Sequence, residues 1–205
     1  MEQVAEEKKR IRLLMKELTS SLSLEVIQHE SAAAVEHFLS SELFLQADCI
    51  LSYMAMKNEI NPLVITECAL REQKIVALPR IIPHTNEMQF YKISNAVPLE
   101  AQLELGMWGI REPHADKAAL FAPTMDMSRI VVVVPGVAFS NNGLRLGHGK
   151  GYYDKYLSAL QQQCAPGSIT CVGMCLSEQK NIVVPTDRYD FKMDYLLSPS
   201  ELHRC

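Results

Sequence analysis

The spacing of apolar residues predicts two helices at the start of the chain. Apolar residues recur at helical spacing over residues 4–18 and again over residues 24–38. The polar residues Ser20, Ser21 and Ser23 lie between the two stretches, where they interrupt the apolar pattern and supply a cap for the second helix.

From residue 49 the pattern changes to short apolar runs that alternate with helical stretches. The strongest strand signal is residues 130–134, a continuous run of β-branched residues. A run without alternation indicates a strand that is covered on both faces, as in a parallel or mostly parallel sheet. The other expected elements are strands over residues 49–53, 74–78 (ended by Pro79), 88–93 and 169–176, a helix opened by Asn61 and Pro62, and a helix that begins near Gly151.

Strands that alternate with helices predict a layered α/β fold. We expect a single domain over residues 1–205, because no linker or internal repeat interrupts the pattern and this length suits one core. Residues 97–123 are rich in turn-forming residues and include the only tryptophan, Trp108, whereas residues 198–205 are expected to form a loose tail.

Composition and charge narrow the class of protein. The hydrophobic share of 48% and the charged share of 21% are typical of globular proteins in water. The formal net charge is -4, and the longest basic cluster, residues 8–12, is too small for the footprint of a nucleic-acid binder. No apolar run is long enough to span a membrane, and the acidic N-terminus resembles neither a secretory signal nor a transit peptide. We therefore expect a cytoplasmic monomer or weak dimer without nucleic-acid or membrane partners.

The six cysteines show no spacing typical of a metal site or a redox motif, since no CxxC pair occurs. Cys171 and Cys175 lie within an apolar run. We expect packed, reduced thiols.

The residues best suited to bind a ligand lie between the expected strand at 130–134 and the helix that follows it. Three glycines alternate there and allow backbone amides to approach an anion closely. The positive end of the following helix points to the same place, as do two basic side chains. These features predict a phosphate cradle at the carboxyl end of a buried strand. Its residues are Arg145, Gly147, His148, Gly149, Lys150 and Gly151.

The spacing of this loop fits neither the P-loop pattern nor the dinucleotide fingerprint. An ordinary connection that uses glycine for positive φ is the alternative interpretation. The two basic residues, together with Asp154 at the start of the helix, favour phosphate binding, although Asp154 alone could simply complement the helix dipole.

Residues 145–154, RLGHGKGYYD, resemble the signature of the 5-formyltetrahydrofolate cyclo-ligase family, commonly RLGRGxGYYD. In two places the chain departs from the family pattern: His148 stands where Arg is frequent, and Ser140 stands where Asp is common. Histidine, unlike arginine, is charged only part of the time near physiological pH, so a phosphate contact there would be weaker. The resemblance covers residues 8–197 and includes a basic N-terminal helix, Asn58-Glu59-Ile60, Leu78-Pro79-Arg80, residues 106–113, residues 135–139, and a closing segment around Asp190 and Asp194.

The resemblance implies a fold and an activity. The fold would be a three-layer α/β arrangement with a mixed, mostly parallel sheet flanked by helices, similar to sugar-phosphate isomerases and CoA-transferases, with two leading helices. The activity would be the ATP- and Mg²⁺-dependent closure of 5-formyltetrahydrofolate to 5,10-methenyltetrahydrofolate, with release of ADP and phosphate. ATP would phosphorylate the formyl oxygen, and N10 of the folate would then attack the activated carbon.

The resemblance also implies residue roles. The catalytic residues would be Arg145, Lys150 and Tyr153; ATP would contact Lys9, Arg10 and Tyr152 in addition to the cradle residues; the folate would contact Met56, Glu59, Arg80, Trp108 and Tyr153; and Mg²⁺ would be held by Asp154 and Asp190.

Simpler interpretations of several of these residues remain open. Basic residues near the N-terminus usually form a solvated helix face, Met56 and Trp108 could be core residues, and Asp187, Asp190 and Asp194 could form an exposed acidic turn. Two other functions also remain: a folate- or nucleotide-binding protein without turnover, and a sugar-phosphate isomerase-like enzyme that does not use ATP. The second would have no need for Lys150 and Asp154 as an ATP–Mg²⁺ pair.

Overall fold

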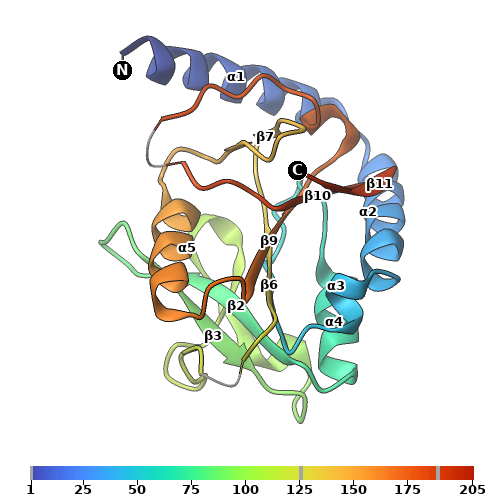
Figure 1. Cartoon of the computed structure of the whole chain (residues 1–205), viewed down its shortest axis with the longest axis vertical. Coiled ribbons are helices and arrows are strands. Elements are labelled where there is room, and N and C mark those ends of the chain that lie inside the picture. Colours follow the sequence, from blue (N-terminus) through green and yellow to red (C-terminus); the bar gives the residue numbers. More distant parts are fainter. Residues whose placement is uncertain (1, 125–126, 188–189) are drawn as a thin grey trace.

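A seven-stranded sheet forms the centre of the computed structural model, which describes residues 2–124, 127–187 and 190–205 except for the side chains of Glu2 and Trp108 (Figure 1). The strand order is β11-β10-β9-β6-β1-β2-β3. The elements are α1 (Glu2–Ser21), α2 (Leu24–Leu39), α3 (Glu42–Leu45), β1 (Cys49–Leu51), α4 (Leu63–Arg71), β2 (Ile75–Ile81), β3 (Met88–Ile93), η1 (Leu99–Gln102), β4 (Leu103–Leu105), η2 (Met107–Gly109), β5 (Arg111–Pro113), β6 (Ile130–Val134), β7 (Ala138–Phe139), β8 (Arg145–Leu146), α5 (Tyr152–Gln163), β9 (Ile169–Met174), η3 (Ser177–Gln179), β10 (Tyr195–Ser198) and β11 (Glu201–Arg204).

The sheet is mostly parallel, as predicted. Strands β10, β9, β6, β1 and β2 run parallel, and β3 and β11 pair antiparallel at the two edges. Strand β6 lies between β1 and β9 and is buried along its whole length, which confirms the interpretation of its unbroken β-branched run.

The two faces of the sheet bury different residues because successive side chains point to opposite sides. Ile50, Val131 and Val133 pack in the cluster beneath α2 and α4. Leu51 and Val132 pack on the opposite face beneath α5. Figure 1 shows α2, α3 and α4 on one side of the sheet and α5 on the other, which gives the three layers expected.

Helix α1 lies across one end of the sheet, above β7 (Figure 1). Ile11 and Met15 pack there in a small separate cluster with Val137, Leu146 and Val184. Strand β6 leads upward into this region, so α1 covers the end of the sheet at which β6 terminates. The two helices meet where the sequence predicts, because Ser23 accepts a hydrogen bond from the Val26 amide and caps α2.

Two local predictions were wrong. Pro79 does not end its strand, since β2 continues to Ile81. Strand β1 ends at Leu51, opposite Ala77, so beyond Ala77 strand β2 has, within the described residues, only β3 as a hydrogen-bonded neighbour. Pro79 lacks a backbone N–H, and it is tolerated there because no second strand needs that donor. The C-terminal residues are also not a loose tail, because β11 pairs antiparallel with β10 over four residue pairs.

The helix expected at Asn61 and Pro62 begins one residue later. Helix α4 starts at Leu63, and the Asn61 side chain accepts a hydrogen bond from the Leu63 amide at 3.0 Å. Asn61 therefore satisfies one of the unpaired amides at the helix start, as its residue type suggests.

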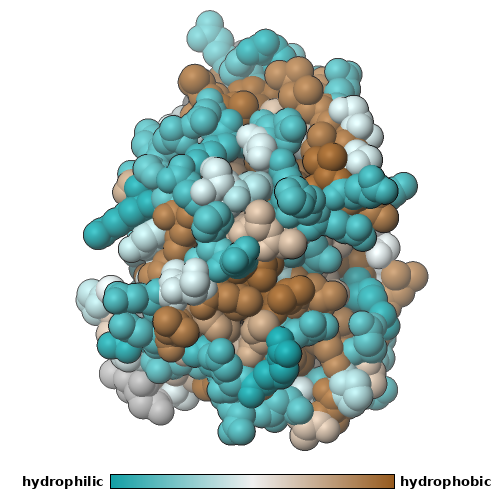
Figure 2. Space-filling model, turned by 90° about the vertical axis from the view of Figure 1, so that its right-hand side faces the viewer, coloured by the Kyte–Doolittle hydropathy of each residue, from teal (hydrophilic) through white to brown (hydrophobic). Residues whose placement is uncertain are grey.

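The side of the molecule that carries α2, α3 and α4 is largely polar, with an irregular apolar band across its middle (Figure 2). Among the described residues, no helix combines the length and the hydropathy needed to cross a bilayer.

Candidate active site

A pocket of about 1200 Å³ opens at the carboxyl end of the parallel strands. Tyr53, which follows β1, Ile81 at the end of β2, and Pro135, which follows β6, all line it. This is where open α/β sheets bind their ligands. Pockets for small molecules typically measure about 300–1000 Å³, so this one is slightly larger than the usual range.

The glycine-rich loop forms one wall of this pocket and leads into α5. Gly149 and Gly151 have positive φ angles of 95° and 70°, which favour glycine. Gly151 directly precedes the first turn of α5. The loop is tied to α1, because Arg12 Nε donates to the Gly147 carbonyl at 2.8 Å. The predicted cradle therefore lies at a helix N-terminus, where backbone amides and the helix dipole favour an anion.

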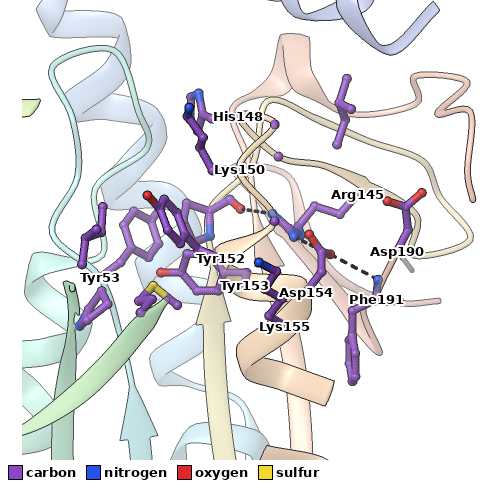
Figure 3. Close-up of a pocket in the computed structure, with 18 of the residues that line it drawn as sticks. Tyr53, Arg145, His148, Lys150, Tyr152, Tyr153, Asp154, Lys155, Asp190 and Phe191 are labelled. Carbon is purple, nitrogen blue, oxygen red and sulfur yellow. Dashed lines mark hydrogen bonds and ion pairs between the residues drawn. The ribbon is translucent and has the colours of Figure 1, made fainter. Parts of the chain in front are cut away.

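Arg145 lies at the base of the loop with its side chain 3% exposed. Its guanidinium donates to the Pro135 carbonyl at 3.2 Å and to Asp154 Oδ1 at 2.8 Å, and it lies 5.6 Å from the centre of the Tyr153 ring (Figure 3). Within the described part of the chain, its Nε has no hydrogen-bond partner. Arg145 therefore presents a buried cation with unused donor capacity beside the cradle.

Lys150, Tyr152 and Tyr153, for which the sequence predicts roles with ATP or in catalysis, also line the pocket. The Lys150 side chain is exposed, whereas the Tyr153 hydroxyl is buried and has no partner among the described residues. Burial raises the pKa of Tyr153 well above its usual value. Tyr153 is therefore a neutral phenol that can donate a hydrogen bond to a ligand but cannot act as a base near neutral pH.

The basic residues of α1 reach the pocket in a different register from the one predicted. Lys8 and Arg12 line the pocket one helical turn apart, whereas Lys9 and Arg10 are exposed and lie outside its lining. Arg10 instead pairs with Glu7 at 2.6 Å. Successive helix residues point about 100° apart, so only one of the two adjacent lysines can face inward.

Lys8 is 8% exposed and pairs with two carboxylates at the far end of the chain. Its Nζ lies 2.7 Å from Asp190 Oδ2 and 2.9 Å from Asp187 Oδ2. Burial lowers the pKa of Lys8, but its hydrogen bonds to Asp190 and Asp187 outweigh that effect and raise the pKa above its usual value. Lys8 is therefore a fixed positive charge at the pocket wall.

Asp154 and Asp190, the residues predicted to hold Mg²⁺, both line the pocket (Figure 3). Asp154 Oδ1 accepts from the Phe191 amide at 3.2 Å, which brings the segment after Asp190 next to α5. Mg²⁺ typically takes one or two protein carboxylates together with phosphate oxygens, so the chemistry of this pair fits the ion. In the described residues, no group of three or more His, Cys, Asp or Glu side chains is placed to hold a metal ion.

The other end of the pocket contains the residues predicted for folate. Met56 and Glu59 line it, and Glu59 Oε2 accepts from the Met56 amide at 2.9 Å. Tyr53, which lies on the side of the pocket away from Arg145 in Figure 3, fixes this segment because its hydroxyl donates to the Ile60 carbonyl at 2.7 Å. Glu59 Oε1 is 3.0 Å from His148 Nε2.

One of the predicted folate residues, Arg80, is not brought into the pocket lining, and another cannot be placed. Arg80 donates to Glu104 and to the Pro113 carbonyl, both at 2.6 Å, and so holds β4 and β5 against β2. Trp108 lies in η2, and its side chain is outside the described residues.

Sequence reasoning missed Glu112, a pocket residue that is only 4% exposed. Burial raises its pKa, and this effect outweighs the hydrogen bond from the Ile81 amide and the charge of Arg80, which lower it. The side chain fits because Gly106 faces it: a Cβ at Gly106 would lie 2.3 Å from Glu112 Oε2. The sequence contains both residues within 106–113, but their contact is apparent only in the folded structure.

Several contacts between basic side chains and carboxylates occur among the described pocket residues. Lys8 pairs with Asp187 and Asp190, Arg145 pairs with Asp154, and His148 contacts Glu59. In the Lys8–Asp190 and Arg145–Asp154 pairs, a cation suited to phosphate neutralises a carboxylate suited to a metal ion. Lys8 and Arg145 are thus neutralised by carboxylates, and a bound polyanion together with a divalent cation could replace each partner with one of the same sign.

Comparisons with known proteins identify the family of this chain. The model of the 5-formyltetrahydrofolate cyclo-ligase family matches residues 4–199. A probable 5-formyltetrahydrofolate cyclo-ligase of Schizosaccharomyces pombe is 29% identical, with 96% of this chain and 97% of the relative covered. A probable enzyme of the same name from Caenorhabditis elegans is also 29% identical, with 98% of this chain and 97% of the relative covered.

Solved structures show the same fold. The 5,10-methenyltetrahydrofolate synthetase of Aquifex aeolicus superposes with a TM-score of 0.74 at 27% identity, covering 96% of this chain and 92% of that one. The synthetase of Mycoplasma pneumoniae gives a TM-score of 0.68 at 22% identity, covering 94% and 98%, and supports the fold alone. With a family model that spans nearly its whole length, the chain belongs to the 5-formyltetrahydrofolate cyclo-ligase family.

Proposed function

We propose that this protein is an ATP-dependent ligase that closes 5-formyltetrahydrofolate to 5,10-methenyltetrahydrofolate and releases ADP and phosphate. The observation that carries the proposal is one pocket with two chemically different ends. A cationic glycine-rich loop forms one end, and the Met56–Glu59 segment with its carboxylate forms the other. Membership in the cyclo-ligase family supports the same reaction.

The chemistry needs the two substrates to be aligned. A formamide oxygen is a weak nucleophile and a poor leaving group, so it must first become a phosphate ester. The formyl oxygen attacks the γ-phosphorus and ADP leaves; N10 then attacks the formyl carbon, loses its proton, and phosphate leaves as the ring closes. Catalysis of such a transfer rests on positioning and on stabilising charge.

Arg145, Lys150 and Tyr153 are the proposed catalytic residues. Arg145 is already buried and partly unsatisfied, so its guanidinium can bind a transferring phosphoryl group with little loss of solvation. Lys150 lies on the same loop and can add a second charge. Tyr153 can donate its unpartnered hydroxyl to an oxygen at the reacting centre.

The nucleotide would lie against the loop and α1. Lys8 and Arg12 are proposed to contact the phosphates together with the loop residues, because these two side chains reach the pocket. Asp154 and Asp190 would hold Mg²⁺, which neutralises charge on phosphate oxygens when bound. As phosphate draws Arg145 and Lys8 away, the two carboxylates become available for the ion.

The folate would occupy the end of the pocket near β1. Glu59 is 11% exposed in its side chain and can accept hydrogen bonds from the amino and ring N–H groups of the pterin. Met56 and the ring of Tyr153 provide apolar surface for the ring system. All six cysteines, each in the described part of the chain, are free thiols, which suits the reducing conditions of the cytoplasm that we propose as the location.

A direct test follows the near-ultraviolet absorbance of the methenyl product with 5-formyltetrahydrofolate, ATP and Mg²⁺. We expect an increase that requires both ATP and Mg²⁺ and that Lys150→Ala and Asp154→Ala each abolish. Lys16→Ala, an exposed lysine on α1 outside the pocket lining, is the matched control and should retain full activity. Binding of folate or ATP by calorimetry without product formation would instead identify a non-catalytic binding protein. Absence of both binding and turnover would refute the proposal.

A further inference from the structure

One hydrogen bond connects the two ends of the pocket. His148 Nε2 lies 3.0 Å from Glu59 Oε1, although the two residues are 89 positions apart in the chain. Because a carboxylate accepts, the imidazole nitrogen is the donor in this contact. The contact joins the glycine-rich loop to the Met56–Glu59 segment across the pocket that both line.

The two partners differ in how firmly they are held. Glu59 is 11% exposed, and its other oxygen accepts from the Met56 amide. His148 is 51% exposed in its side chain and lies between Gly147 and Gly149, whose φ angle is 95°. Glu59 is therefore the fixed partner, and His148 is the one whose side chain can turn away into solvent or toward a second anion.

We infer that His148 exchanges between Glu59 and the nucleotide phosphates and thereby couples the two substrate sites. The inference rests on the proposed function, in which Glu59 receives the pterin and the loop receives ATP. In the free protein His148 occupies the carboxylate that the pterin needs. When phosphates bind the loop, His148 pairs with them and leaves Glu59 free for folate.

Linkage makes this coupling reciprocal. If ATP raises the affinity for folate by removing His148 from Glu59, then folate must raise the affinity for ATP by the same factor. Coupling between sites typically amounts to about 5- to 150-fold. His148 is thus a positioning residue that acts on the folate through Glu59, and it favours the complex with both substrates over either complex with one.

The experiment measures the affinity for 5-formyltetrahydrofolate by calorimetry, with and without a non-hydrolysable ATP analogue. In the wild-type protein, we expect the analogue to tighten folate binding by roughly fivefold or more. His148→Ala should bind folate several-fold more tightly than the wild type in the absence of nucleotide, and the analogue should then have little further effect. His148→Gln retains an N–H donor that can contact Glu59, so it should restore part of the coupling.

His29→Ala, an exposed histidine on α2, is the matched control and should behave like the wild type. If His148→Ala binds folate no more tightly than the wild type, or retains the full effect of the analogue, the inference is wrong. If the wild type binds both ligands but independently, the inference is also wrong, while the proposed function stands. If the wild type binds neither ligand, the proposed function fails, and the inference fails with it.

Discussion

Arg145 Nη2 and Asp154 Oδ1 are 2.8 Å apart, so a residue proposed to bind phosphate and a residue proposed to bind metal neutralise each other in the free protein. The guanidinium keeps this position because Gly147 leaves space for it: a Cβ at Gly147 would lie 2.7 Å from Arg145 Nη1. The glycine of the signature therefore has a second role besides the approach of an anion, namely to admit the arginine.

We expect Gly147→Ala to lower kcat/KM by about 10- to 100-fold, because an error of about 1 Å in a catalytic group can cost this much. The added methyl group meets the end of a side chain rather than the backbone, so the fold should persist. Thermal unfolding, measured together with the kinetics, distinguishes a loss of activity from a loss of folded protein. Full activity at an unchanged melting temperature would show that the guanidinium can move without consequence.

Because Lys8 faces the pocket and Lys9 faces solvent, substitutions of these adjacent lysines should have different effects. Lys8→Ala removes a cation that pairs with Asp187 and Asp190, and we expect it to raise the KM for ATP at least tenfold and to lower the free energy of unfolding by about 2 kcal/mol. Lys9→Ala removes an exposed charge outside the pocket lining and should change stability by less than about 0.5 kcal/mol. Steady-state kinetics and chemical denaturation measure both quantities. Equal effects of the two substitutions would mean that the helix binds the nucleotide through its other face.

Glu112 should make stability depend on pH. Its pKa is raised in the folded protein by burial, so its contribution to stability is present below the unfolded value, about 4.3, and is lost as the pH rises through the folded value. Glu112→Gln removes this titration and keeps an acceptor for the Ile81 amide. We expect the variant to be more stable than the wild type by about 1 kcal/mol near neutral pH, and the difference to vanish in acid. Denaturation curves at several pH values test this, and a difference that does not vary with pH would contradict it.

Replacing His148 by arginine restores the residue that is frequent at this position in the family. Arginine stays charged at all relevant pH values and presents several donors, whereas histidine loses its charge as the pH rises. His148→Arg should therefore bind ATP more tightly, by about tenfold. Because arginine can also pair more strongly with Glu59, folate binding without nucleotide should weaken. Calorimetry with each ligand alone measures both effects, and an unchanged affinity for ATP would argue against a phosphate contact at this position.

Local patterns determined much of the fold in advance. The unbroken apolar run of β6 indicated a strand covered on both faces, and the alternating glycines indicated a loop between that strand and α5. These features depend on neighbours in the chain, and so they could be predicted from the sequence. The same holds for the cap of α2 by Ser23.

Features that depend on distant segments could not be predicted in this way. Lys8 shares a helix face with the buried Ile11 and Met15, so the apolar pattern of α1 could have favoured Lys8 over Lys9. Its partners Asp187 and Asp190, however, lie in a distant segment. Strand β11 has a polar sequence, so its pairing with β10 is visible only when both strands are placed in the sheet. Arg80 looked like a ligand residue after a strand, but it holds β4 and β5 because Glu104 lies opposite it.

The pairing of Lys8 with Asp190 joins positions that are 182 residues apart, and this separation has a consequence for biosynthesis. A ribosome adds about 5–20 residues per second, so α1 leaves it roughly 10 to 40 seconds before the carboxylates that pair with Lys8 have been made. During that interval, α1 can already pack on residues 137–147 through Ile11, Met15 and Arg12, but the ammonium of Lys8 has no carboxylate partner at the pocket wall. A messenger that is truncated just before the codon for Asp187 would therefore yield a protein with most of its core and an unfinished binding site.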